Sequence, residues 1–229
     1  MSIFAIADLH LSLAKPKEMD IFGEKWVRHF EKIKADWENR VGEEDTVLIP
    51  GDISWAMKLE DAQADLDAIG ALPGKKILLK GNHDYWWGSL NKINAVLKNK
   101  TIALQNNCAE VGDFVVCGTR GWTFDNLSAE SDSKIYEREK LRLALSLEAA
   151  KKCSAQKIIV MMHYPPIYQD MLETGFTQII EQYPVEQVVF GHLHGDILNR
   201  INLTDIMVKN IKYNLVSADY LDFKLKKII

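Results

Sequence analysis

Short apolar segments rich in β-branched residues recur along the chain, and this pattern is typical of buried strands. The clearest are residues 3–7, 46–49, 76–79, 157–162 and 187–190. Between them, apolar residues recur three or four positions apart, as on the buried face of a helix. These helical patterns cover residues 26–37, 59–69, 134–152 and 176–183. The alternation of the two patterns predicts an α/β fold.

The rest of the chain is predicted to add strands to the same domain. Residues 114–117 and the tail from 206 to 229 are predicted to form further strands. No repeat, low-complexity linker or change in composition divides the sequence, so residues 1–229 are predicted to form a single domain. The polar segment 125–133 lacks periodicity and is predicted to be mobile. The longest apolar runs are of strand length and far too short for a membrane span.

Composition narrows the class of protein. Of the 229 residues, 47% are hydrophobic and 26% are charged, which is the balance of a globular protein with a buried core. The formal net charge of −4 argues against a protein that holds nucleic acid by bulk positive charge. The three cysteines lack close spacing and suggest reduced thiols, and the N-terminus is a poor signal peptide, so a cytoplasmic location is expected.

Residue types that bind metal ions follow directly after each of the five clearest strands. The segments at the strand ends are Asp8-Leu9-His10, Gly51-Asp52, Gly81-Asn82-His83-Asp84, His163 and Gly191-His192-Leu193-His194. In open α/β folds, ligands bind beyond the carboxyl ends of the strands, so these five segments can converge on one crevice.

The donors at these strand ends are nitrogen and oxygen atoms without a thiolate, which suits two divalent ions such as Mn, Fe, Zn, Co or Ni. The candidate ligands are Asp8, His10, Asp52, Asn82, His163, His192 and His194. Seven side chains exceed what one transition metal accepts, so two ions that share a carboxylate are expected. Asp52 is the natural bridge, because each of its oxygens can face one ion.

Each segment has a plain structural alternative when it is taken alone. Gly51-Asp52 is a common turn sequence, Asn82 and Asp84 fill turn or helix-cap positions, and His163 could be a hydrogen-bonded core histidine. Their joint occurrence in this order at five strand ends makes these alternatives improbable. His29 lies in a helical pattern without a motif, and it is interpreted as structural.

Taken together, these motifs resemble those of the calcineurin-like metallophosphoesterase superfamily, over residues 8–194. The resemblance implies a four-layer α/β/β/α sandwich, in which two mixed sheets are flanked by helices. It also implies how the candidate ligands are shared between two ions. The first ion would be held by Asp8, His10, Asp52 and His194, and the second by Asp52, Asn82, His163 and His192.

The implied activity is that of a metal-dependent phosphoric ester hydrolase, which cleaves a phosphomonoester or phosphodiester by attack of a hydroxide that bridges the ions. His83 lies outside the implied ligand set, and it is predicted to be catalytic, by protonating the leaving oxygen or contacting the phosphate. Asn82 is also expected to lie against the substrate. A non-catalytic phosphate- or metal-binding scaffold with the same fold is the alternative.

The sequence departs from the protein phosphatases of this superfamily, which continue Gly-Asp-x-x-Asp-Arg-Gly. Residues 51–57 lack both the second Asp and the Arg, so a protein-phosphatase role is disfavoured. Arg120 is either a replacement phosphate ligand or an ordinary surface arginine. Aromatic residues near the motifs could line a pocket for a nucleotide-like substrate or pack the loops against the core, and core packing is favoured. They are Trp55, Tyr85, Trp86, Trp87, Trp122, Tyr164 and Tyr168.

Overall fold

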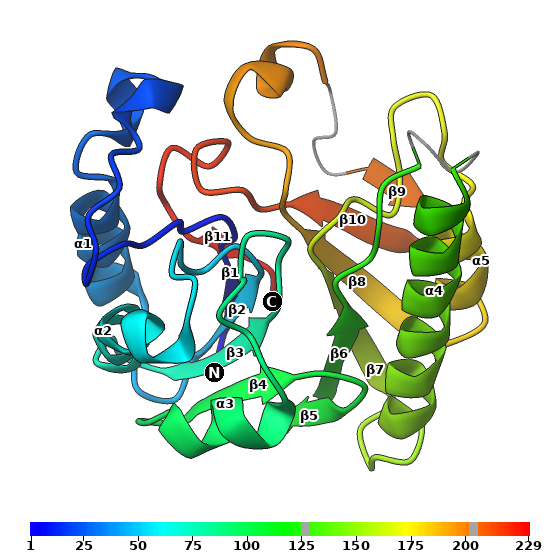
Figure 1. The fold of residues 1–229 in the computed structure, drawn as a ribbon. Coiled ribbons are helices and arrows are strands. Elements are labelled where there is room, and N and C mark those ends of the chain that lie inside the picture. The colour runs from blue at the N-terminus through cyan, green and yellow to red at the C-terminus, as the bar shows by residue number, and fades with distance from the viewer. Residues whose placement is uncertain (125–128, 202–205) are drawn as a thin grey trace.

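The strands of the protein form two mixed sheets in a computed structural model that describes residues 1–124, 129–201 and 206–229 (Figure 1). The first sheet has the order β11-β1-β2-β3-β4, with β1 (Ile3–Ala5), β2 (Thr46–Pro50), β3 (Lys75–Leu79), β4 (Thr101–Leu104) and β11 (Lys226–Lys227). The second has the order β5-β6-β7-β8-β10-β9, with β5 (Cys108–Val111), β6 (Phe114–Thr119), β7 (Lys157–Met162), β8 (Val185–Phe190), β9 (Ile206–Val208) and β10 (Ile211–Leu215).

Both sheets have parallel centres and antiparallel edges. Strands β1 to β4 run parallel to one another, and β11 pairs antiparallel with β1. Strands β6, β7, β8 and β10 are likewise parallel, while β5 and β9 pair antiparallel at the two edges. Because parallel strands end at the same edge of a sheet, this topology gathers the segments that follow β1, β2, β3, β7 and β8.

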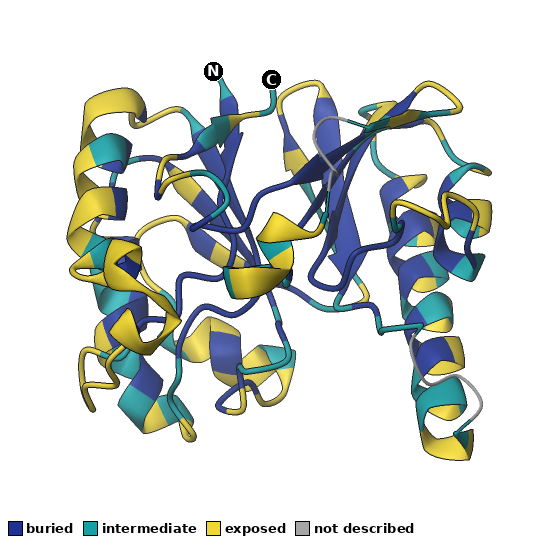
Figure 2. Cartoon of the chain, turned by 90° about the horizontal axis from the view of Figure 1, so that it is seen from above, coloured by how far each residue is buried: buried dark blue, intermediate teal, exposed yellow. Residues whose placement is uncertain are grey.

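Helices cover the outer face of each sheet. The first sheet is covered by α1 (His29–Arg40), α2 (Leu59–Gly70) and α3 (Leu90–Val96), and the second by α4 (Glu130–Ala150) and α5 (Gly175–Ile180). Figure 2 shows that the strands are almost entirely buried, whereas the outer faces of the helices are exposed. The predicted sandwich of two mixed sheets flanked by helices is therefore confirmed.

Strand periodicity explains why the buried strands are apolar on both faces. In β2, Val47 and Ile49 pack toward the helices, while Leu48 packs into the core between the sheets. In β7, Val160 faces α4 and α5, and Ile159 faces the first sheet. Successive side chains of a strand point to opposite faces, so a strand between two cores requires a continuous apolar run.

Some element boundaries differ from the sequence prediction. Helix α1 begins at His29, because Trp26 belongs to a short 3-10 turn, Glu24–Trp26. Helix α4 begins at Glu130, so the prediction of a mobile segment is wrong for residues 130–133, and residues 125–128 lie outside the described residues. Short 3-10 turns also occupy Asp20–Phe22 and Gly195–Asn199. Among the described residues, no helix is both long and apolar enough to cross a membrane. The single domain stays a prediction.

Candidate metal centre

The segments that follow β1, β2, β7 and β8 are joined by backbone hydrogen bonds at one edge of the sandwich. The backbone N–H of His10 donates to the carbonyl oxygen of Asp52 (2.9 Å), which joins the ends of β1 and β2. The N–H of Gly191 donates to the carbonyl oxygen of His163 (3.2 Å), and that of His192 donates to the Asp8 carboxylate (3.0 Å). The two sheets therefore meet at the predicted site, and these bonds fix the position of its backbone.

Four of the predicted ligands have a left-handed backbone conformation. The φ angles are 58° for Asp8, 46° for His10, 53° for Asp52 and 71° for His192. Few non-glycine residues adopt this conformation, and such residues cluster at functional sites, where the surrounding structure holds them in place. Here the conformation turns the chain sharply after β1, β2 and β8, which brings side chains from different strands to one place.

Two glycines allow the strand ends to approach closely. A Cβ on Gly81 would lie 2.1 Å from Oδ1 of Asp52, and one on Gly51 would lie 2.6 Å from Nδ1 of His163. Both distances are far below van der Waals contact. The glycines of the two motifs are thus needed because a neighbouring ligand occupies the space of a side chain.

The first group of ligands contains Asp8, His10 and His194, whose donor atoms lie close enough together to share one ion. The Nε2 atoms of His10 and His194 are 3.3 Å apart, and Oδ2 of Asp52 lies 3.7 Å from Nε2 of His10. Two ligand atoms that each lie about 2.0–2.2 Å from one ion are separated by about 3–3.6 Å. The spacing of this group therefore fits a divalent metal.

The second group contains Asn82, His163 and His192. Oδ1 of Asn82 lies 2.5 Å from Nε2 of His163 and 2.9 Å from Nδ1 of His192. The other ring nitrogen of His163 lies 3.1 Å from the carbonyl oxygen of Pro50, to which it can donate. A hydrogen bond of this kind leaves Nε2 free to bind a metal and fixes the orientation of the ring.

Asp52 lies between the two groups. Its Oδ2 atom is 3.7 Å from Nε2 of His10 and 3.5 Å from Nε2 of His163, is buried, and has no hydrogen-bond partner among the described residues. Its Oδ1 atom accepts the backbone N–H of His83 (2.8 Å). The geometry therefore differs from the expectation of one oxygen for each ion, because a single oxygen faces both groups. Burying such an oxygen is costly unless a cation or a donor compensates for it.

The electrostatics of the two groups favour bound cations. Burial raises the pKa of Asp8 to about 7, and burial together with the neighbouring Asp84 and Asp8 raises the pKa of Asp52. Burial and the adjacent histidines hold the pKa values of His10 and His163 well below their usual range. Neutral imidazoles are the form that binds metals, and buried carboxylates require positive charge nearby. The residues present thus fit a pair of divalent ions.

His83 lies beside the candidate ligands and outside both groups. Its ring centroid is 5.7 Å from that of His10 and 4.5 Å from that of Trp55, and its Nδ1 atom has no partner among the described residues. The side chain is half-buried, and burial lowers its pKa. The structure therefore leaves a neutral imidazole next to the metal site and accessible to a substrate.

Asp84 has a positioning role that the sequence reasoning did not identify. This fully buried carboxylate accepts the backbone N–H groups of Asp52 (3.0 Å), Ile53, Ser54 and Gly81 (2.7 Å), and also the indole N–H of Trp86. It joins the segment after β2 to the segment after β3. Its place in Gly81-Asn82-His83-Asp84 was the only available signal, because three of its partners come from the distant segment after β2.

Arg120 follows β6, and its backbone is hydrogen-bonded to the segment that contains His163. Its carbonyl oxygen accepts the N–H groups of His163 (3.1 Å) and Tyr164 (2.9 Å). Its guanidinium is mostly buried and lines a cavity, so the alternative of an ordinary surface arginine is disfavoured.

The aromatic residues near the motifs divide into two classes. Trp86, Trp87 and Tyr164 are buried, as core packing predicts. Trp55 is half-buried and stacks on His10, with ring centroids 4.7 Å apart. Tyr85 is exposed near His83. The buried Tyr164 also lies against two candidate ligands, with its ring centroid 4.2 Å from that of His192 and 5.4 Å from that of His163. Aromatic contact with the site is thus made by residues after β2, β3 and β7.

His29 belongs to neither group of ligands, and both of its ring nitrogens contact main-chain carbonyl oxygens. Its ring nitrogens lie 2.9 Å from the carbonyl oxygen of Leu9 and 3.2 Å from that of Trp26. These contacts agree with its interpretation as a structural residue at the start of α1.

Comparison with known proteins shows which family the chain resembles. The chain is 39% identical over 87 residues to the Gene 66 protein of Mycobacterium phage D29, a stretch that covers 36% of this chain and 40% of that relative. A solved structure of a protein of unknown function from Aquifex aeolicus matches 99% of this chain and 95% of its own, with a TM-score of 0.51 and 15% identity, and this likeness concerns the fold alone. The calcineurin-like phosphoesterase family matches residues 1–196, which include all the candidate ligands. The chain therefore belongs to the calcineurin-like phosphoesterase family.

Proposed function

We propose that this protein is a dinuclear metal-dependent phosphohydrolase that cleaves a phosphomonoester or phosphodiester of modest size. The observation that carries the proposal is the buried Oδ2 atom of Asp52, which has no partner among the described residues and faces one imidazole nitrogen from each group of ligands. A carboxylate oxygen in this position suits a bridge between two ions. Family membership supports metal-dependent phosphoester hydrolysis as the type of reaction.

When bound, the ions lower the pKa of a water molecule and offset the charge that develops on phosphorus. The protein orients the metal ligands through hydrogen bonds made by their other polar atoms. One example is the bond that Nδ1 of His163 can donate to the carbonyl oxygen of Pro50. Trp55 covers one face of the His10 ring and limits the access of water.

His83 is proposed to act on the substrate. Its neutral imidazole can hold a hydrogen bond to a phosphate oxygen. The negative charge of a bound phosphate raises the pKa of a nearby imidazole, and the imidazolium can then give its proton to the leaving oxygen. The hydrogen bond from the His83 backbone to Oδ1 of Asp52 keeps this residue beside the bridging carboxylate.

The substrate is proposed to be a small molecule rather than a phosphoprotein. The segment Gly51–Met57 lacks the second Asp and the Arg of the protein-phosphatase motif. The half-buried Trp55 occupies part of this segment and stacks on His10. The described strand ends thus supply a metal centre with aromatic neighbours instead of that arginine.

The test is a panel of phosphomonoesters and phosphodiesters, each assayed with Mn²⁺, Zn²⁺, Ni²⁺ and Mg²⁺ after removal of bound metal. Hydrolysis that depends on added metal and is absent in Asp52→Asn supports the proposal. If no substrate is hydrolysed with any of the metals, the proposal is overturned in favour of a non-catalytic scaffold that kept the fold.

A further inference from the structure

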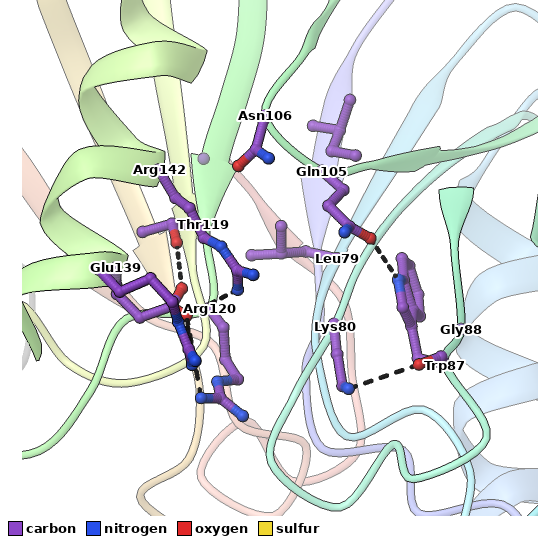
Figure 3. A pocket seen from close by; sticks show the side chains of 13 residues that line it. Leu79, Lys80, Trp87, Gly88, Gln105, Asn106, Thr119, Arg120, Glu139 and Arg142 are labelled. Carbon is purple, nitrogen blue, oxygen red and sulfur yellow. Dashed lines mark hydrogen bonds and ion pairs between the residues drawn. The ribbon is translucent and has the colours of Figure 1, made fainter. Parts of the chain in front are cut away.

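A cavity of about 200 Å³ lies between the ends of β3 and β4 on one side and β6 and α4 on the other. Figure 3 shows Lys80, Arg120 and Arg142 directed toward this space from three separate elements. Arg138 also lines the cavity, and Glu139 is the acidic residue among its lining residues. The residues that line it therefore carry a net charge of about +3, from four cations and one carboxylate.

The single carboxylate is already saturated. Glu139 is fully buried and accepts the hydroxyl of Thr119 (2.6 Å), and its carboxylate lies 2.8 Å from Arg142 and 3.3 Å from Arg138. Arg120 is more distant, with Nη2 3.9 Å from Oε1 of Glu139. One carboxylate cannot neutralise three guanidinium groups, so donors remain for a further anion.

Two of the cations have few partners among the described residues. Nε of Arg120 is buried without a hydrogen-bond partner. The ammonium group of Lys80 has one long contact, at 3.5 Å, to the carbonyl oxygen of Trp87.

The cavity adjoins the candidate metal ligands. Lys80 stands two residues before Asn82, a span of at most about 7 Å along the backbone. Arg120 is joined to His163 by the hydrogen bond from the His163 N–H to its carbonyl oxygen. None of the seven candidate ligands lines the cavity, so a substrate that reaches both sites must pass the segments around Asn82 and His163.

We propose that this cavity is a second anion subsite, which binds a second phosphate group of the substrate whose scissile phosphoester lies at the metal centre. The inference rests on the proposed function and narrows its substrate class to small phosphoesters that carry another phosphate, such as nucleoside bisphosphates. One guanidinium group can bind two oxygens of a phosphate at once. Partial burial of the site strengthens each of these charge-assisted hydrogen bonds.

The first test measures binding without any metal. Pyrophosphate is titrated calorimetrically into the protein in the presence of a chelator, so that no metal ion can bind it at the metal centre. Binding is expected for the parent protein, and Lys80→Met and Arg138→Met are each expected to weaken it at least about fivefold. Lys134→Met is the matched control, since this lysine lies on α4, pairs with Glu130 and is mostly exposed. Equal binding by the parent and both variants overturns the subsite.

The second test compares hydrolysis of adenosine 3′,5′-bisphosphate with that of adenosine 5′-monophosphate. The parent is expected to prefer the bisphosphate by about tenfold or more in kcat/KM, and this preference is expected to decrease in Lys80→Met and Arg138→Met but not in Lys134→Met. Metal content and circular dichroism show whether each variant is folded and loaded.

The two tests separate the two proposals. Metal-free binding that requires Lys80, without hydrolysis of either nucleotide or of any ester in the panel with any of the metals, supports an anion site in the cavity and contradicts the phosphohydrolase. Equal hydrolysis of both nucleotides, without metal-free binding, supports the phosphohydrolase and contradicts the subsite.

Discussion

The metal centre and the neighbouring cavity are opposite in charge and in construction. At the metal centre, the buried Asp8 and Asp52 lie among histidines that burial keeps neutral, so the centre lacks positive charge. In the cavity, three arginines and a lysine face one saturated carboxylate, so the cavity lacks negative charge. The net charge of −4 for the whole chain conceals both imbalances.

This difference shows which part of the chain sets the geometry of each region. The metal centre is fixed by strand ends, left-handed backbone and mutual hydrogen bonds, so its geometry is set by the main chain. The cavity is lined by long side chains from the end of β3, the end of β6 and helix α4. Changes at the metal centre should therefore have large effects on activity, whereas single changes in the cavity should weaken anion binding only moderately.

The largest effect is expected for Asp52→Asn, which removes the charge of the oxygen that faces both groups of ligands. We expect loss of both ions and a decrease in turnover of at least about 10³-fold, because neither group then keeps its shared anionic ligand. Elemental analysis measures the metal, and pyrophosphate binding in chelator should be unchanged. Two metals retained per chain would contradict the bridge.

The next largest effect is expected for His83→Ala. This change leaves all seven candidate ligands in place, so metal content should stay the same, while turnover falls about 10²- to 10³-fold through loss of the proton donor. The loss should be greatest for substrates with a poor leaving group. A variant as active as the parent on such a substrate would exclude His83 from the reaction.

Asp84→Asn tests whether the metal centre depends on its main-chain framework. In the parent, several backbone N–H groups donate to the Asp84 carboxylate. The variant places an amide N–H₂ group against some of these donors, which then lose their acceptor. We therefore expect a loss of about 2–3 kcal/mol in the free energy of unfolding. Denaturant melts of the metal-free protein measure this loss. Unchanged stability would show that the segments after β2 and β3 hold their positions without Asp84.

The smallest effect is expected from pH, and it should separate the two regions. Burial raises the pKa of Asp8 from 3.8 to about 7, so the metal-free fold holds a proton that the unfolded chain releases in that range. This group's contribution to the stability of the metal-free fold is therefore lost as the pH rises from about 4 to 7. A metal ion must displace the proton, so its apparent affinity should fall by about tenfold for each pH unit below 7.

The measurement is the difference in melting temperature between the metal-loaded and metal-free protein, which should widen from pH 5.5 to pH 7.5. An anion whose own charge is constant over this range, such as sulfate, should bind in the cavity with little change in affinity. A difference that is constant with pH would mean that Asp8 is already ionised in the metal-free protein.

Much of the fold follows from local pattern. The apolar runs of β2, β3, β7 and β8 were predictable because strands buried on both faces must be apolar throughout. Strands β4 and β5 and helix α3 were missed, since each is short and carries little periodicity of its own. The early start of α4 at Glu130 was also missed, because its first turn is polar.

The sequence by itself determined the candidate ligands, since the motifs Asp8-Leu9-His10, Gly81-Asn82-His83-Asp84 and Gly191-His192-Leu193-His194 are local and each follows a strand. The tertiary structure alone decided which oxygen of Asp52 faces both groups, what Asp84 holds together, and that Lys80, Arg120 and Arg142 line one cavity. The physical reason is distance along the chain. A strand and the residues that end it are set by neighbouring positions, whereas a charge imbalance between separate elements exists only after they have packed together.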